Sequence, residues 1–169
     1  YTSEVHKGPF AFRVLKDSKL VKSKSFEDGV TIDFYKSGKI RENIIVSPLS
    51  KYDDVKKQNI LYNYLLAFIG SPKLSQGKPA QYATVWNDSL PGAYFEIKGD
   101  KYSLFVMTVY DDTHRYTYYM SKPHDVHVSN YKLRDIVQYV TYKNTKDGYK
   151  KMKLGLGMPS RAFSNNRVH

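Results

Sequence analysis

Cysteine is absent from this 169-residue chain. Its absence excludes disulfides, thiolate nucleophiles and cysteine-ligated metals, and it fits either a reducing cytosol or an extracytoplasmic protein that needs no bridges. The chain begins at Tyr1 rather than at a methionine, so we expect either a trimmed chain or a mature form that has lost a signal peptide, the second being common for secreted and periplasmic proteins. An extracytoplasmic location, secreted or periplasmic, is therefore favoured over the cytoplasm.

Long apolar runs are also missing. The longest apolar stretch, residues 60–69, is interrupted by Tyr62, Asn63 and Tyr64, and it is about half of the ~20 residues that a membrane-spanning helix needs. The sequence therefore predicts a protein that is not transmembrane.

Signatures of familiar catalysis and of nucleotide binding are lacking. No serine stands in a Gly-x-Ser-x-Gly elbow, and no phosphate-binding loop with Gly-Lys-Ser/Thr is present. Gly155-Leu156-Gly157 is a fragment of a dinucleotide-binding fingerprint without its third glycine. We therefore expect no cofactor, and the sequence favours a protein that is not an enzyme.

Acidic residues are few relative to basic ones, with 16 Asp and Glu against 27 Lys and Arg and a net charge of +11. A field of this sign attracts an anionic partner or surface: an acidic protein, a glycan, lipid headgroups or nucleic acid. In residues 143–169 the only acidic side chain is that of Asp147. Lys150, Lys151 and Lys153 in this region either belong to a solvated edge strand or bind the anionic partner.

What the chain does contain is strand-like alternation. Phe10, Phe12 and Val14 share one face of a first predicted strand, and a β-hairpin is predicted from Val30 to Val46, with its turn at residues 36–39. Further along, the predicted strands are residues 81–86, 93–98, 102–110 and 115–120, with turns at residues 90–92, 99–100 and 111–113. Such short turns join antiparallel neighbours, so these strands form a meander.

Two helices are predicted. The first, from Tyr52 to Ile69, ends at Gly70-Ser71-Pro72, and the second begins at Ser129 or Asn130. The second helix would keep one apolar face, made of Leu133, Ile136, Val137 and Val140. A basic strand is then predicted at residues 148–154.

These elements predict an α+β fold, in which two helices pack on one face of a curved, mainly antiparallel sheet built from the hairpin and the meander. Residues 1–154 form a single domain in this prediction, and residues 155–169 form a basic tail that contains glycine and proline.

Tyrosine is abundant, and four tyrosines on the central strands are candidate binding residues: Tyr102, Tyr110, Tyr116 and Tyr118. Tyr116 and Tyr118 share a face of one strand. On a basic protein, such rings can stack on the bases of single-stranded nucleic acid or on sugars. The alternative is that tyrosines simply suit half-buried sheet faces, with the ring inside and the hydroxyl at water.

Two further constellations are weak candidates for chemistry. Glu96, His114 and Arg115 lie in neighbouring predicted strands, and together they would supply a base, an acid and a cation for a ribonuclease-type reaction. Glu96 is more simply the polar member of an alternating strand. His124, Asp125 and His127 follow Pro123 and would form a metal site on a turn, although exposed His and Asp in a polar loop are ordinary.

The sequence therefore predicts a non-enzymatic module that binds a ligand or another protein through a basic, tyrosine-rich surface. The alternative is a nucleic-acid-binding protein or a small basic nuclease.

Overall fold

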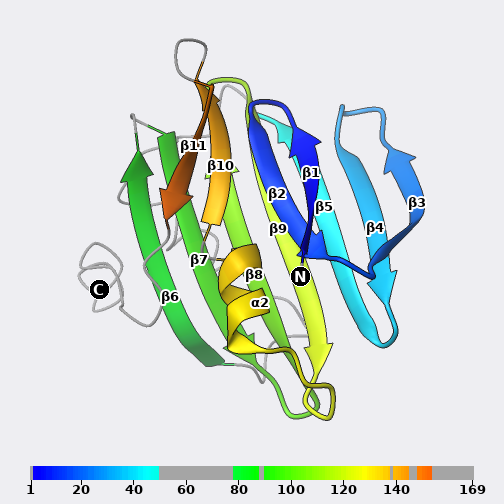
Figure 1. The fold of residues 1–169 in the computed structure, drawn as a ribbon. Coiled ribbons are helices and arrows are strands. Elements are labelled where there is room, and N and C mark those ends of the chain that lie inside the picture. The colour runs from blue at the N-terminus through cyan, green and yellow to red at the C-terminus, as the bar shows by residue number, and fades with distance from the viewer. Residues whose placement is uncertain (1, 50–77, 88–89, 138, 145–147, 154–169) are drawn as a thin grey trace.

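The computed structural model describes residues 2–49, 78–87, 90–137, 139–144 and 148–153 (Figure 1). These residues form a seven-stranded sheet, a four-stranded sheet and one short helix, and all strand pairings are antiparallel. In spatial order, the strands of the larger sheet are β3 (Lys19–Ser25), β4 (Thr31–Ser37), β5 (Ile40–Pro48), β9 (His114–Pro123), β8 (Tyr102–Tyr110), β7 (Leu90–Lys98) and β6 (Lys78–Asn87).

The smaller sheet lies over one face of the larger one (Figure 1). Its strands, in spatial order, are β1 (Thr2–Lys7), β2 (Phe10–Leu15), β10 (Tyr139–Asn144) and β11 (Gly148–Lys153). The helix α2 (Asn130–Val137) lies on the same side of the larger sheet. We call the face of the larger sheet that packs against the smaller sheet its inner face and the opposite face its outer face. The outer face is also buried in part, since Leu104, Val106 and Thr108 of β8 lie on it and are at most 1% exposed.

The predicted hairpin and meander are confirmed. β4 and β5 pair from Thr31 with Val46 to Ser37 with Ile40, and Gly38 takes a positive φ of 57° in the turn between them. β6, β7, β8 and β9 follow one another as antiparallel neighbours. The described part of the chain is thus mainly antiparallel β-sheet, as its alternation indicates.

Two local predictions need correction. Leu90, Pro91 and Gly92, expected as a turn, begin β7 and pair with β6. Pairing between β7 and β8 starts only at Gly92, so Pro91 lies where the strand has a neighbour on one side and its missing N–H is tolerated. Val140, expected on the second helix, lies in β10, because α2 ends at Val137.

The start of α2 follows the expected capping. The Ser129 hydroxyl accepts a hydrogen bond from the Lys132 N–H at 3.4 Å, and the Ser129 carbonyl accepts one from the Leu133 N–H at 3.1 Å. Among the described residues, no helix is long and apolar enough to cross a membrane. The helix predicted from Tyr52 to Ile69 and the tail 155–169 lie outside the described residues.

The core fills the space between the two sheets. Phe10 and Phe12 of β2 are fully buried against the inner face, and the ring of Phe10 meets that of Tyr116 edge-on, with the centroids 5.0 Å apart. Ile136 of α2 is also fully buried in this cluster. The other buried members are Val14, Leu15, Ile40, Ile44, Phe105, Met107, Val109, Tyr118, Met120 and Val128.

Candidate functional site: the basic face of strands β3 to β5

The tyrosines of the predicted stacking platform are mostly inside the protein. Tyr116 and Tyr118 do share a face, but it is the inner face, where they are 3% and 0% exposed. Tyr110 is buried as well, and Tyr102 alone of the four is exposed, at 38%. A stacking platform needs accessible ring faces, so Tyr116 and Tyr118 are core residues here rather than a binding surface.

The three residues of the suggested catalytic constellation are not brought together. Glu96 of β7 is in register with Phe105 and, one strand further, with Met120. His114 starts β9 six residues before Met120, which is roughly 20 Å along a strand. Because alternate side chains point to opposite faces, Arg115 lies on the face opposite to Glu96.

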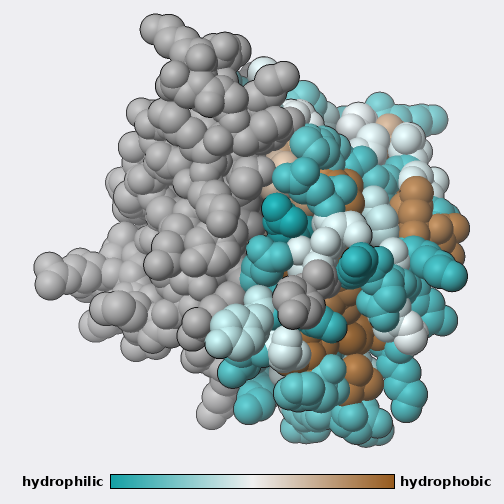
Figure 2. Space-filling model, viewed as in Figure 1, coloured by the Kyte–Doolittle hydropathy of each residue, from teal (hydrophilic) through white to brown (hydrophobic). Residues whose placement is uncertain are grey.

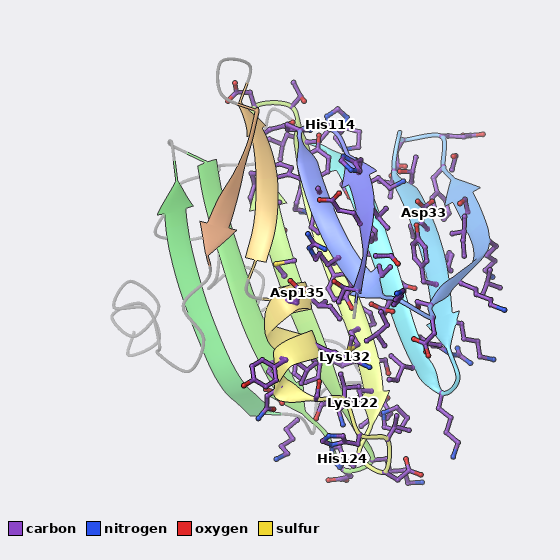
Figure 3. The ribbon with its side chains drawn as sticks, viewed as in Figure 1. Asp33, His114, Lys122, His124, Lys132 and Asp135 are labelled. Carbon is purple, nitrogen blue, oxygen red and sulfur yellow. The ribbon has the colours of Figure 1, made fainter. Side chains whose placement is uncertain are left out.

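The turn after β9 does not assemble a metal site. The His124 Nε2 atom lies 3.3 Å from the Ser103 hydroxyl, while Asp125 pairs with Lys39 at 3.6 Å and is well exposed (Figure 3 labels His124). His127 is exposed. Within the described part of the chain, no three His, Cys, Asp or Glu side chains are grouped so that they could hold a metal ion.

Lys150, Lys151 and Lys153 lie in β11, which is the outermost strand of the smaller sheet and, among the strands that the structure describes, pairs only with β10. This position agrees with the first of the two predicted alternatives, a solvated edge strand. Their role in partner binding stays a prediction.

A buried acidic side chain between the two sheets was not among the predicted site residues. Glu42 of β5 is fully buried and accepts hydrogen bonds from the Leu15 N–H at 3.2 and 3.3 Å, from the Ser18 hydroxyl at 2.6 Å and from the Tyr118 hydroxyl. Burial raises the pKa of Glu42, and the hydrogen bonds from Ser18, Tyr118 and Leu15 offset only part of that rise. Glu42 therefore ties the end of β2 to the larger sheet.

Asp111 organises the turn between β8 and β9. One of its carboxylate oxygens accepts bonds from the backbone N–H groups of Thr113 (2.9 Å) and His114 (2.7 Å), and the other accepts a bond from the Tyr116 hydroxyl at 2.9 Å. Burial by itself would raise the pKa of Asp111, but these donors outweigh it and lower the pKa. The arrangement is a local turn motif that uses Tyr116 as a brace.

The basic side chains of β3, β4 and β5 lie together on one face of the sheet. Residues paired directly across neighbouring strands project to the same side of a sheet. Lys19 and Lys36 are such a pair, Lys36 in turn pairs with Arg41, and Lys22 pairs with Phe34. Lys24 lies two residues from Lys22 and shares its side. We call Lys19, Lys22, Lys24, Lys36 and Arg41 together the basic face.

All five cations of the basic face are exposed, and they lie on the outer face of the larger sheet. The strand positions between them on that face carry Ile32, Phe34, Asn43 and Ile45, so none of the intervening strand residues is acidic. The Nζ atom of Lys22 lies 4.9 Å from the centre of the Phe34 ring, a cation–π contact that holds the ammonium over the strand.

The carboxylates of the same three strands point the other way. Asp33 forms an ion pair with Lys7 of β1, and the burial of Asp33, which alone would raise its pKa, is outweighed by bonds to Lys7 and Ser23, so the pKa falls (Figure 3). Glu42 is directed into the core. Both acids are therefore neutralised or buried on the inner side, and the outer side is left uniformly positive.

No protein-family model and no curated protein sequence matches this chain. Its function must therefore be inferred from the arrangement of its own residues.

Proposed function

We propose that this protein is a non-enzymatic interaction module that binds an anionic partner through the basic face of β3, β4 and β5. The observation that carries the proposal is the segregation of charge on these strands: five exposed cations on the outer side and no acidic strand residue among them. Like charges that lie directly opposite one another on a sheet lower the stability of the fold. An anionic partner bound to this face would neutralise that repulsion.

The experiment compares two variants that lose the same charge at different places. Lys22→Gln/Lys24→Gln/Arg41→Gln removes three cations of the basic face, and Lys98→Gln/Lys101→Gln/Lys132→Gln removes three elsewhere. With heparin as a polyanionic probe, we expect the first variant to bind about tenfold more weakly or worse, and the second to bind within about twofold of the wild type. Equal losses in both variants would show that net charge alone, and not this face, governs binding.

Nucleic acid is the alternative partner, and the specific observation in its favour is Phe34, an aromatic ring set among the cations of the basic face. Binding of a labelled single-stranded oligonucleotide should then weaken steeply between about 50 and 200 mM salt. At a fixed salt concentration, Phe34→Leu should weaken oligonucleotide binding more than heparin binding, because it removes a ring on which a base could stack as well as the contact to Lys22. If Phe34→Leu changes the binding of neither probe, stacking has no part in recognition. An anionic protein or glycan is then preferred to nucleic acid as the partner.

The C-terminal basic region is proposed as an auxiliary contact. Lys143 lies in β10, and β11 follows it, so removing residues from Lys143 onward would remove part of the smaller sheet. A truncation that tests the tail must therefore start at Gly155. A secreted or periplasmic location stays part of the proposal, and detecting the protein by antibody in separated cell fractions tests it.

A further inference from the structure

β3 is an unpaired edge with an unusual surface. It is the last strand of the larger sheet, and no other strand among the described residues pairs with its outer side. All seven of its residues are exposed. Two of them are large and apolar: Leu20 is 54% exposed and Val21 is 62% exposed. Figure 2 shows this apolar surface over β3.

The hydrogen bond just after the C-terminal end of β3 shows which backbone N–H and C=O groups of the strand face β4 and which face the open edge. The Phe26 N–H donates to the Val30 carbonyl at 2.9 Å, so Phe26 directs its N–H toward β4. In an antiparallel ladder the residues of one strand alternate between bonding to the neighbour and pointing away. Lys24 and Lys22, paired with Ile32 and Phe34, therefore bond toward β4, whereas Ser23 and Ser25 present their N–H and C=O groups to the open edge.

The side chains at this edge select the partner. A strand added to β3 would bond to Ser23 and Ser25, and its residues opposite Lys22 and Lys24 would form the closer, non-hydrogen-bonded pairs. Lys22 and Lys24 are about 6.6–6.8 Å apart along the strand, which is the spacing of alternate residues in any strand. A second copy of β3 would place lysine opposite lysine and be repelled, whereas acidic residues at alternate positions would meet both lysines.

We propose that β3 accepts an extended acidic segment of a partner protein as an additional strand, bonded to Ser23 and Ser25 and paired by its alternate carboxylates with Lys22 and Lys24. This inference rests on the proposed function and gives it a partner class and a binding mode. Lysine on a free edge usually prevents association. Here the exposed Leu20 and Val21 argue for an occupant, and the lysines determine that the occupant is acidic.

The probe is a capped peptide in which threonine and glutamate alternate, and its control is a peptide of the same composition with the glutamates contiguous. Fluorescence anisotropy should show the alternating peptide binding more tightly than its control. Ser25→Pro removes one edge N–H without touching the β3–β4 ladder and should weaken binding about tenfold. Ser25→Ala keeps that N–H and should bind like the wild type.

Hydrogen exchange of the unmodified protein gives a second readout should the proline variant fold poorly: the Ser23 and Ser25 amides should slow when the alternating peptide binds. Peptide binding without protection of these amides, or binding untouched by Ser25→Pro in a folded variant, would overturn the inference. If heparin binds at the basic face and neither peptide binds, strand addition is wrong and the proposed function stands. If neither heparin nor peptide binds, both are wrong.

Discussion

Glu42 shows what a single residue contributes beyond what its position in the sequence reveals. By alternation Glu42 shares a face of β5 with Ile40, Ile44 and Val46, so the pattern itself directs it inward, and it is fully buried beneath the end of β2. Three donors make that burial tolerable: Leu15 at the end of β2, Ser18 shortly after it, and Tyr118 of β9. Local periodicity gives the face of Glu42 but not its hydrogen-bond partners, and the alternative reading of the tyrosines placed their rings inside but their hydroxyls at water, whereas the Tyr118 hydroxyl bonds to Glu42.

The raised pKa of Glu42 predicts the direction in which the stability of the protein changes with pH. The folded protein holds this proton more tightly than the unfolded chain does, so the stabilising contribution is present below the unfolded pKa of 4.5 and is lost as pH rises through the folded pKa. Above pH 4.5, the free energy of unfolding of the wild type should fall with pH relative to that of Glu42→Gln, with a slope of at most about 1.4 kcal/mol per pH unit.

Urea titrations at a series of pH values measure this difference. Asp33 and Asp111, whose pKa values are lowered, contribute with the opposite sign, because their stabilisation is lost as pH falls. Both are present in the wild type and in Glu42→Gln, so their contributions cancel in the comparison. Glu27→Gln, at an exposed position of the turn between β3 and β4, is the matched control. Parallel curves for the wild type and Glu42→Gln would refute the assignment.

At the scale of elements, the hairpin and the meander were predictable because both signals they need are local. Alternating apolar residues mark the strands, and Gly38, Gly99 and Asp111 mark the reversals. β3 was missed because an exposed edge strand has no buried face and therefore no alternation: its sequence is KLVKSKS. The basic face depends on that strand, so it could not be assembled from the sequence. The helix at residues 52–69 stays a prediction.

Two hairpin turns, β1–β2 and β4–β5, offer a matched pair of glycines. Gly8 and Gly38 have nearly equal positive φ angles, 55° and 57°, but a Cβ added at Gly8 would lie 2.2 Å from the Tyr116 hydroxyl oxygen, whereas one at Gly38 meets nothing within 4 Å. Gly38→Ala should cost roughly 1–2 kcal/mol for the left-handed backbone alone. Gly8→Ala should cost roughly 1–3 kcal/mol more, because Tyr116 is held by Asp111 and cannot move freely.

Denaturant unfolding of the two variants gives this difference. Adding Tyr116→Phe to Gly8→Ala should cost less than the sum of the two single changes, because the phenylalanine lacks the atom nearest the new methyl. Equal losses for Gly8→Ala and Gly38→Ala would mean that the turn yields easily and that the Tyr116 contact does not fix the smaller sheet to the larger one.

At the scale of the whole molecule, the stacking of two sheets was not predictable. The smaller sheet joins strands from both ends of the described chain, since Ala11 pairs with Thr141 and Phe10 with Tyr142. Local patterns identify each strand but not such a distant neighbour. The composition did indicate the overall character, a single cysteine-free chain with excess positive charge. It could not indicate that β3, β4 and β5 carry their basic side chains on the outer face and their carboxylates on the inner face.

That separation also bears on how quickly the protein finds a partner. Charges fixed on one side of these strands give that side a local positive field, which attracts an approaching polyanion before any contact is made. For the proposed anionic partner, we therefore expect an association rate above the usual 10⁵–10⁷ M⁻¹s⁻¹ at low salt, and a fall in that rate as salt screens the field beyond about 10 Å.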